Sequence, residues 1–290
     1  MIKMNYIYSS IVFVLVMLGC GSSSSESLKE ESVLKQLSFI AWDGIENDKC
    51  VQEHIDGFTI SVLYLNPLEN GSNTFDTNAE TLAKDNIVAW YLLSAISPYP
   101  SYEYIENQIE KIEEYNSLHV KKILGISLDV EPWVEFAEQN SEANQESWQE
   151  YLDFLEHVKS MLDIKGLELS VMIPFWLDNI PKAFVSERPL NEEIIDRVDE
   201  VVVMAYSNDV NRILEYAQSS LFYADTQKNK RVKIAIEMEA NENSGISFYE
   251  NPEALQTLVQ IPSAYKSFQG YVIHTLDAFC RSGVKLSYAK

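Results

Sequence analysis

Basic side chains are scarce in this chain of 290 residues. Its 22 lysines and arginines stand against 44 aspartates and glutamates, which gives a formal net charge of -22. Such a charge repels nucleic acid and anionic lipid, so a nucleic-acid partner is excluded as a working hypothesis. Three cysteines and ten glycines are too few for a disulfide-dense or collagen-like scaffold.

Residues that usually hold metals and cofactors are also sparse. The four histidines, at positions 54, 119, 157 and 274, form no His-x-x-x-His pair, so a zinc site of the usual kind is not expected. The chain has no Gly-rich phosphate loop and no Gly-x-Ser-x-Gly elbow. We therefore expect no cofactor. A carboxylate-only Mg²⁺ or Ca²⁺ site at Asp129, Glu131 and Glu237 is the alternative.

The first twenty residues have the layout of a secretory signal peptide. Lys3 precedes an apolar run, Ile11 to Leu18, that is too short to span a bilayer as a mature helix. Gly19-Cys20 follows and resembles the bacterial lipoprotein signal, in which the cysteine is lipidated, for example with palmitate, and becomes the mature N-terminus. The alternative is an ordinary signal peptide cut nearby, which leaves Cys20 without a role.

Residues 21–32, rich in serine and glutamate, are expected to form a flexible tether, followed by one folded domain over 33–290. The domain then lies in the bacterial cell envelope, extracytoplasmic (periplasmic or at the cell surface), a monomer that meets the membrane only through its lipid anchor. Disulfides are permitted there, so Cys50 and Cys280 either form a bridge or stay as two buried thiols.

Apolar runs of strand length alternate with helical patterns along the rest of the chain. The predicted strands are Leu37–Ala41, Gly57–Tyr64, Ile87–Leu93, Lys122–Val130, Leu167–Phe175, Glu200–Tyr206, Val232–Met238 and Gly270–Leu276. The predicted helices are Tyr102–Leu118, Glu142–Leu162, Asn191–Arg197, Val210–Thr226 and Pro252–Ile261. Eight strand–helix units in a domain of about 250 residues predict a single (β/α)8 TIM barrel, an α/β fold. An open doubly wound sheet is the alternative.

The fourth predicted strand carries two acidic residues on one face. Side chains two positions apart on a strand point the same way, so Asp129 and Glu131 face the barrel interior together. Pro132 ends the strand and places Glu131 at its carboxyl end, where barrel enzymes keep their chemistry. Two carboxyls this close cannot both ionise freely, so one pKa should rise and supply a general acid.

This strand resembles the strand-four signature of glycoside hydrolase family 18, the chitinases and endo-β-N-acetylglucosaminidases, which reads Asp-x-x-Asp-x-Asp-x-Glu. Gly125, Ile126, Asp129 and Glu131 match it, while Leu124 and Ser127 replace its first two aspartates. Val203-Met204-Ala205-Tyr206 resembles the family's strand six. Gly270 to Asp277 resembles its last strand, with His274 in place of a tryptophan. The chain also looks like bacterial lipoproteins with an Asp-Val-Glu-Pro strand.

The resemblance implies roles for these residues. Glu131 would be the general acid, Asp129 would orient the substrate's N-acetyl group, and Tyr206 would hydrogen-bond that group. Apart from the resemblance, His274 is an inward or rim candidate that would bind substrate or assist the acid, and a purely structural histidine is the alternative.

A second resemblance is to the large clan of retaining barrel glycosidases, whose Asn-Glu-Pro motif is similar to Val130-Glu131-Pro132. That clan takes its nucleophile from strand seven. On the seventh predicted strand of this sequence, Glu237 and Glu239 alternate with apolar residues. Glu237 is the better candidate for the nucleophile. A carboxylate about 5 Å from Glu131 would permit a covalent two-step mechanism.

Aromatic residues after the strands could form sugar-binding platforms. Trp42 follows the first strand, and Trp176 and Asp178 follow the fifth. Trp90 and Trp133 are weaker cases, and core packing is the alternative for each tryptophan.

Together these patterns predict a carbohydrate-active surface lipoprotein, a retaining glycoside hydrolase acting on an oligo- or polysaccharide, with Glu131 as general acid. A barrel that binds glycans without cleaving them is the alternative function.

Overall fold

The computed structural model describes residues 37–42, 62–65, 88–95, 99–120, 123–133, 141–179, 188–243, 245–261 and 264–284. The predicted signal peptide, Cys20, the tether and Cys50 lie outside these ranges. Cys280 is disulfide-bonded, and its partner also lies outside them. No helix within the described ranges is both long enough and apolar enough to cross a membrane.

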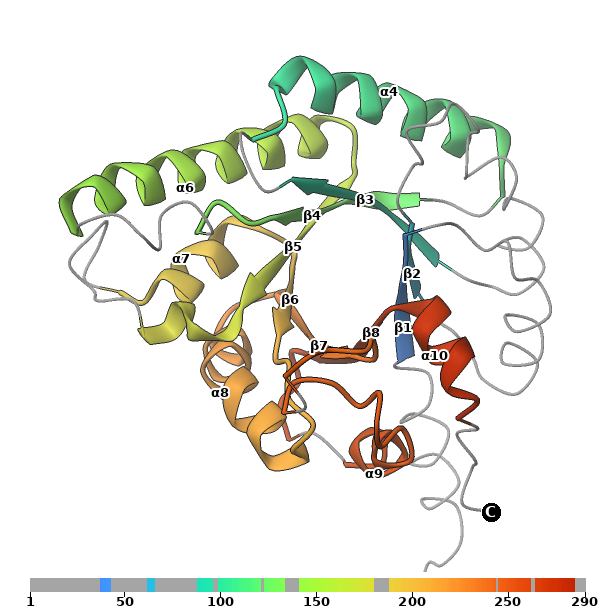
Figure 1. Ribbon diagram of the computed structural model, residues 1–290. Coiled ribbons are helices and arrows are strands. Elements are labelled where there is room, and N and C mark those ends of the chain that lie inside the picture. Colours follow the sequence, from blue (N-terminus) through green and yellow to red (C-terminus); the bar gives the residue numbers. More distant parts are fainter. Residues whose placement is uncertain are drawn as a thin grey trace, which may run out of the picture.

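Eight parallel strands close into a barrel in sequence order, and β1 pairs with β8 to complete the ring (Figure 1). The strands are β1 (Leu37–Ala41), β2 (Val62–Leu65), β3 (Val88–Ala95), β4 (Ile123–Val130), β5 (Glu168–Pro174), β6 (Glu200–Met204), β7 (Arg231–Glu237) and β8 (Phe268–His274). The predicted single (β/α)8 barrel is confirmed. An open doubly wound sheet would have two edge strands, whereas here every strand pairs with a neighbour on both sides.

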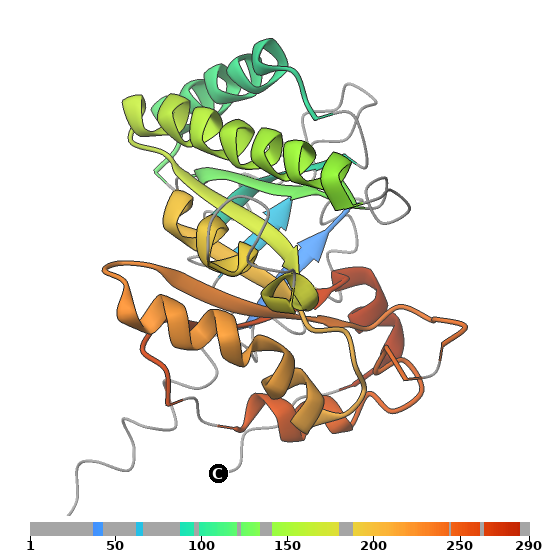
Figure 2. The ribbon, with the colours of Figure 1, turned by 90° about the vertical axis from the view of Figure 1, so that its left-hand side faces the viewer.

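Helices surround the ring of strands. They are α4 (Tyr102–Leu118), α6 (Ser141–Ile164), α7 (Leu190–Arg197), α8 (Val210–Thr226), α9 (Ala254–Val259) and α10 (Leu276–Ser282), with a 3-10 turn η1 (Phe175–Asn179) after β5. The bounds of α4 and α8 agree with the sequence prediction, because each begins at a capping side chain, Ser101 or Asp209. Helices α4 and α6 lie side by side over the β3–β4 side of the barrel (Figures 1 and 2).

Strand β8 lies two residues earlier than predicted. It ends at His274, and Thr275 then caps α10 by accepting a hydrogen bond from the backbone of Ala278. The apolar Leu276, predicted to be in the strand, is instead the first residue of α10. An apolar residue fits a strand end and an amphipathic helix start equally well, so the pattern could not separate the two.

Gly125 is required by the close contact between β4 and β5. A Cβ atom at this position would overlap the backbone carbonyl of Glu168 on β5. The register between β3 and β4 also shifts between Ala89 and Tyr91, opposite this part of β4. The glycine therefore permits the close strand packing that leads up to Asp129.

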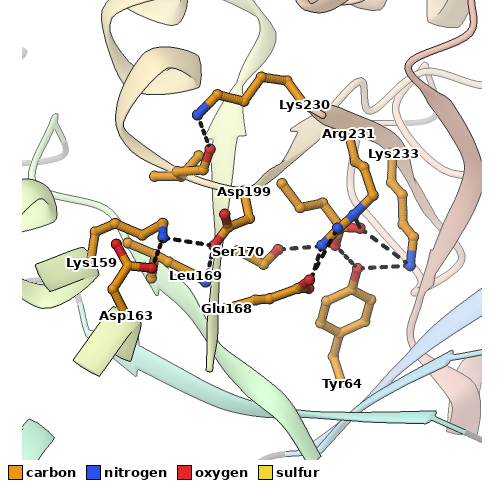
Figure 3. A network of polar contacts seen from close by, with 12 residues as sticks. Tyr64, Lys159, Asp163, Glu168, Leu169, Ser170, Asp199, Lys230, Arg231 and Lys233 are labelled. Carbon is orange, nitrogen blue, oxygen red and sulfur yellow. Dashed lines mark hydrogen bonds and ion pairs between the residues drawn. The ribbon is translucent and has the colours of Figure 1, made fainter. Parts of the chain in front are cut away.

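A network of polar side chains fills the amino-terminal end of the barrel interior (Figure 3). This barrel-floor network comprises Ser38, Tyr64, Glu168, Ser170, Glu200, Arg231 and Lys233. Lys233 donates to the hydroxyl of Tyr64 at 3.1 Å, and that hydroxyl donates to Glu200 at 2.7 Å. Trp90, considered above as a sugar platform, is buried here and stacks on Tyr64 with the ring centroids 6.3 Å apart. This network lies at the opposite end of the barrel from Asp129 and Glu131.

Candidate active site at the carboxyl end of the barrel

Strand β4 brings Asp129 and Glu131 to the carboxyl end of the barrel. Ile126, Leu128 and Val130 are fully buried against the helix layer, while Asp129 and Glu131 are half-buried. Asp129 interacts electrostatically with His274 of β8 and with Tyr206 beyond β6. The carboxyl of Asp129 therefore points across the barrel mouth.

Asp129 lies in an environment that favours its neutral form. Burial and, to a smaller extent, the charge of Glu131 raise its pKa from 3.8 to about 6, although His274 and a hydrogen bond from Ser94 oppose the rise. Its Oδ1 atom is buried without a hydrogen-bond partner. An unsatisfied carboxyl oxygen in a polar mouth is a feature that a ligand donor could satisfy.

The carboxyl of Glu131 is not paired with a Lys or Arg side chain in the described part of the protein. No hydrogen bond or ion pair engages its side chain within the described part of the chain. Burial raises its pKa, and His274 lowers it by a smaller amount. A carboxyl that is half-buried, free of a neutralising Lys or Arg and shifted toward the protonated form suits a general acid.

Glu237, His274 and Trp42 form a hydrogen-bonded chain across β7, β8 and the end of β1. The Nδ1 atom of His274 lies 2.8 Å from Oε2 of Glu237, and the indole N–H of Trp42 donates to Nε2 of His274 at 3.0 Å. The other oxygen of Glu237 accepts from the backbone N–H groups of Met238 and Glu239. Both oxygens of Glu237 are therefore engaged.

Tyr206 lies over His274, with the two ring centroids 6.1 Å apart and the ring planes inclined by 28°. Burial raises its pKa well above 10, and the negative charges of Asp129, Glu237 and Glu131 add to the rise. The phenol is therefore a neutral hydrogen-bond donor at any physiological pH, which suits the recognition of a carbonyl oxygen.

An aromatic cluster borders the carboxylates on the β4–β5 side. Trp133 meets Trp176 of η1 edge to face at 6.2 Å and also contacts Trp148 and Tyr151 of α6. Trp133 is buried and Trp176 is half-buried, so of the two Trp176 keeps more surface for a ligand. Asp178 accepts a hydrogen bond from Asn179, and its pKa is raised by burial. Asp178 makes no contact with the carboxylates.

Tyr151 lies near the site although it belongs to none of the sequence motifs described above. Its side chain is fully buried, its hydroxyl has no hydrogen-bond partner, and burial together with Tyr99, Asp129 and Glu131 raises its pKa. Its burial could be read from the helical spacing of Trp148, Tyr151, Leu152 and Leu155. Its proximity to the two carboxylates could not, because that depends on how α6 packs on β4.

Glu239 and Arg281 form an ion pair at the rim. Glu239 accepts from Thr275 at 2.8 Å and pairs with Arg281 at 2.8 Å, with 38% of its side chain exposed. No group of three or more His, Cys, Asp or Glu side chains in the described ranges is placed to hold a metal ion. The three carboxylates considered above for Mg²⁺ or Ca²⁺ therefore do not form such a group.

The chain is similar to known proteins in its fold. No protein-family model matches the chain, and no curated protein matches it. A chitinase from Chromobacterium violaceum is similar, with 13% identity, a TM-score of 0.53, and coverage of 88% of this chain and 99% of that one. For a GH18 chitinase from Pseudoalteromonas aurantia the corresponding values are 12%, 0.50, 85% and 99%.

The spore cortex-lytic enzyme SleL of Bacillus megaterium is also similar, with 12% identity, a TM-score of 0.50, and coverage of 88% of this chain and 75% of that one. At such low identity the similarity concerns the fold alone. The chain shares its eight-stranded parallel barrel with glycoside hydrolase family 18 chitinases and related proteins.

Proposed function

We propose that this protein is a retaining glycoside hydrolase that cleaves glycans containing β-linked N-acetylhexosamine. The observation that carries the proposal is the pair of carboxyls at the end of β4. Both have raised pKa values, and Glu131 has no neutralising cation among the described residues. The likeness of the barrel to those of chitinases supports the same substrate class.

In the proposed first step, Glu131 gives its proton to the glycosidic oxygen as the bond to the anomeric carbon breaks. The carbonyl oxygen of the substrate's own acetamido group attacks that carbon and forms a cyclic oxazolinium intermediate. Asp129, ionised, accepts the acetamido N–H and balances the positive charge, and the hydroxyl of Tyr206 donates to the acetamido oxygen before the attack. Water then opens the ring and gives a proton to Glu131, which restores the enzyme with net retention.

The mechanism through Glu237 has less support. A covalent nucleophile needs an oxygen free to approach the anomeric carbon, and both oxygens of Glu237 already accept hydrogen bonds from His274 and two backbone amides. The position of Glu237 suits a residue that holds His274. The acetamido-assisted route uses Asp129, whose buried oxygen Oδ1 has no partner.

Ser127 favours a second function, a barrel that binds glycans without cleaving them. The family signature has a carboxylate at this position, next to Asp129 on the same strand face. Here the serine hydroxyl is fully buried and makes no hydrogen bond. Loss of that acid would weaken catalysis more than it would weaken sugar binding, because binding needs only the mouth and its aromatic side chains.

Substrate cleavage by matched variants separates these functions. The wild-type protein, Glu131→Gln and Glu239→Gln are incubated with N-acetylhexosamine oligomers and with plain hexose oligomers, and products are identified by mass. Glu239→Gln is the control, since it makes the same change at the rim ion pair. We expect cleavage of the N-acetylated oligomers only, and a loss of at least about 100-fold in Glu131→Gln alone. Cleavage of plain hexose oligomers would overturn the acetamido-assisted route. Retention of glycans on the protein without cleavage would select the binding function.

We further propose that the enzyme works outside the cytoplasm on a lipid anchor at Cys20. The signal-like segment before this cysteine and the serine-rich stretch after it support that location. Envelope glycans of the cell, or glycans it encounters, would then be within reach of the tethered barrel.

A further inference from the structure

The chain Trp42–His274–Glu237 fixes the protonation of the imidazole by its geometry. An indole nitrogen can only donate, so Nε2 of His274, which accepts from Trp42 at 3.0 Å, must be unprotonated. The proton of the neutral ring then lies on Nδ1 and is donated to Glu237 at 2.8 Å. His274 is therefore neutral in this arrangement, with one tautomer selected by its two partners.

Each member of the chain is held in place by the next. Two backbone N–H groups hold Glu237 at 2.8 and 2.7 Å, and only 7% of Glu237 is exposed. Glu237 holds His274, and His274 holds the Trp42 indole, which it also meets edge-on with the centroids 6.1 Å apart. Trp42 is half-buried at the end of β1, beside β8 in the barrel. The position of its indole therefore depends on the lone pair of His274 Nε2.

Most of the groups that face His274 are carboxylates. They are Asp129 and Glu131 from β4, Tyr206 beyond β6, Glu237 and Glu239 from the end of β7, and Trp42 from the end of β1. Burial has the largest single effect and lowers the pKa of His274, but the hydrogen bond and charge of Glu237 and the charges of Asp129 and Glu239 together raise it above its ordinary value. Protonation places an N–H on Nε2, directed at the N–H of Trp42.

We propose that His274, held by Glu237, is a positioning residue that fixes Trp42 as one wall of the substrate site, and that this contact exists only while His274 is neutral. The inference deepens the proposed function, since Trp42 borders the same mouth as Asp129 and Glu131. At pH values above the His274 midpoint, the Trp42 indole is held in place. At lower pH the indole loses its hydrogen-bond acceptor, so substrate binding weakens although Glu131 is still protonated and can act as the acid.

Nuclear magnetic resonance tests the chain without any substrate. The ¹⁵N signals of the histidine rings and the indole N–H signal of Trp42 are followed from pH 8 to pH 5, with assignments from His274→Gln and Trp42→Phe. We expect a protonated Nδ1 and a bare Nε2 at pH 8, and a Trp42 signal that moves with the same midpoint as His274. A Trp42 signal that stays constant through this titration, or a proton on Nε2 at pH 8, would overturn the proposal.

Two substitutions should shift the His274 midpoint in opposite directions. Glu237→Gln removes the charge that favours the imidazolium and should lower the midpoint by about one pH unit or more. Trp42→Phe removes a donor that favours the neutral ring and should raise it by about half a unit to one unit. Glu239→Gln is the matched charge control and should move it less than Glu237→Gln does. Shifts of the same sign in the first two variants would contradict the hydrogen-bonded chain.

Binding to N-acetylhexosamine oligomers gives the functional readout. We expect KM of the wild type to rise about three- to tenfold as pH falls through the His274 midpoint, with kcat changing less. His274→Gln can accept from Trp42 and donate to Glu237 without titrating, so the KM rise at the His274 midpoint should be absent and only the change from Asp129 should remain, whereas His274→Ala should have a high KM throughout. A KM rise at the His274 midpoint that persists in His274→Gln would refute the positioning role. If no oligomer is cleaved, the proposed function fails. The magnetic resonance experiment still tests the hydrogen bonds that join Trp42, His274 and Glu237.

Discussion

The buried pair of Lys233 (labelled in Figure 3) and Glu200 at the amino-terminal end of the barrel provides a test of how this fold is stabilised. Both side chains are almost completely buried, with 4% and 3% exposed, and their charged atoms lie 3.8 Å apart. Glu200 also accepts from Tyr64 and has Arg231 at 3.5 Å. Glu200 is the one acidic ion-pair partner of Lys233 within the described ranges. The two charges therefore differ in how much they depend on each other.

Glu200→Gln should destabilise the protein more than Lys233→Met. The first change leaves a buried ammonium without an anion, for which a cost of about 3–5 kcal/mol is expected. The second leaves Glu200 beside Arg231, and about 1–2 kcal/mol is expected. The double variant should cost at least about 1 kcal/mol less than the sum, because removing the lysine relieves the uncompensated charge.

Urea denaturation at pH 7 and pH 9 measures these changes. Burial already lowers the pKa of Lys233 despite the nearby Glu200, and removal of the anion lowers it further. In Glu200→Gln the unfolded chain then binds more protons than the folded one, so stability rises with pH. The penalty of Glu200→Gln should therefore shrink between pH 7 and pH 9. Additive single costs, or a penalty independent of pH, would refute the argument that the ion pair offsets a buried charge.

Three further changes have defined outcomes. Gly125→Ala should destabilise the protein by about 1–3 kcal/mol in thermal unfolding because its Cβ overlaps the carbonyl of Glu168, whereas Gly245→Ala, whose Cβ would have ordinary contacts, should cost much less. Asp129→Asn should abolish cleavage yet raise the melting temperature at pH 7.5, because a pKa of about 6 against an ordinary 3.8 means that ionisation costs the fold at most about 3 kcal/mol. The gain should fade toward pH 4, and a constant gain would contradict it. Cys20→Ser should move the protein from the membrane to the soluble fraction, and unchanged membrane binding would contradict the lipid anchor.

The fold was predictable because each element carries its own periodic signal. The bounds of β1, α4 and α8 agree with the pattern of apolar residues, and the caps at Ser101 and Asp209 lie where the helical pattern begins. Predicted bounds were less accurate where the pattern of apolar residues does not mark the end of a strand or helix. Leu276 is an example, because an apolar residue is compatible with both a strand and a helix. The signal peptide and the tether remain predictions, since their residues lie outside the described ranges.

The candidate site was predictable where one strand supplies it. Alternation on β4 is enough to place Asp129 and Glu131 on one face, and the barrel closure brings that face to the mouth. Tyr206 was predicted as the last residue of its strand and Trp176 as a residue following its strand, but the sequence did not show which residues each would contact. Proximity between different strands depends on register and stagger, and the apolar pattern of each strand specifies neither.

The sequence by itself determined the alternation of strands and helices, the bounds of α4 and α8 and the acidic face of β4, because these depend on residues close along the chain. Only the tertiary structure decided that Trp42 meets His274, 232 positions away, and that Lys233 meets Tyr64, 169 positions away. It also decided that Glu237 is a partner of His274 with both oxygens engaged. These contacts arise only when the ring of strands closes in one register, a condition that no local pattern records.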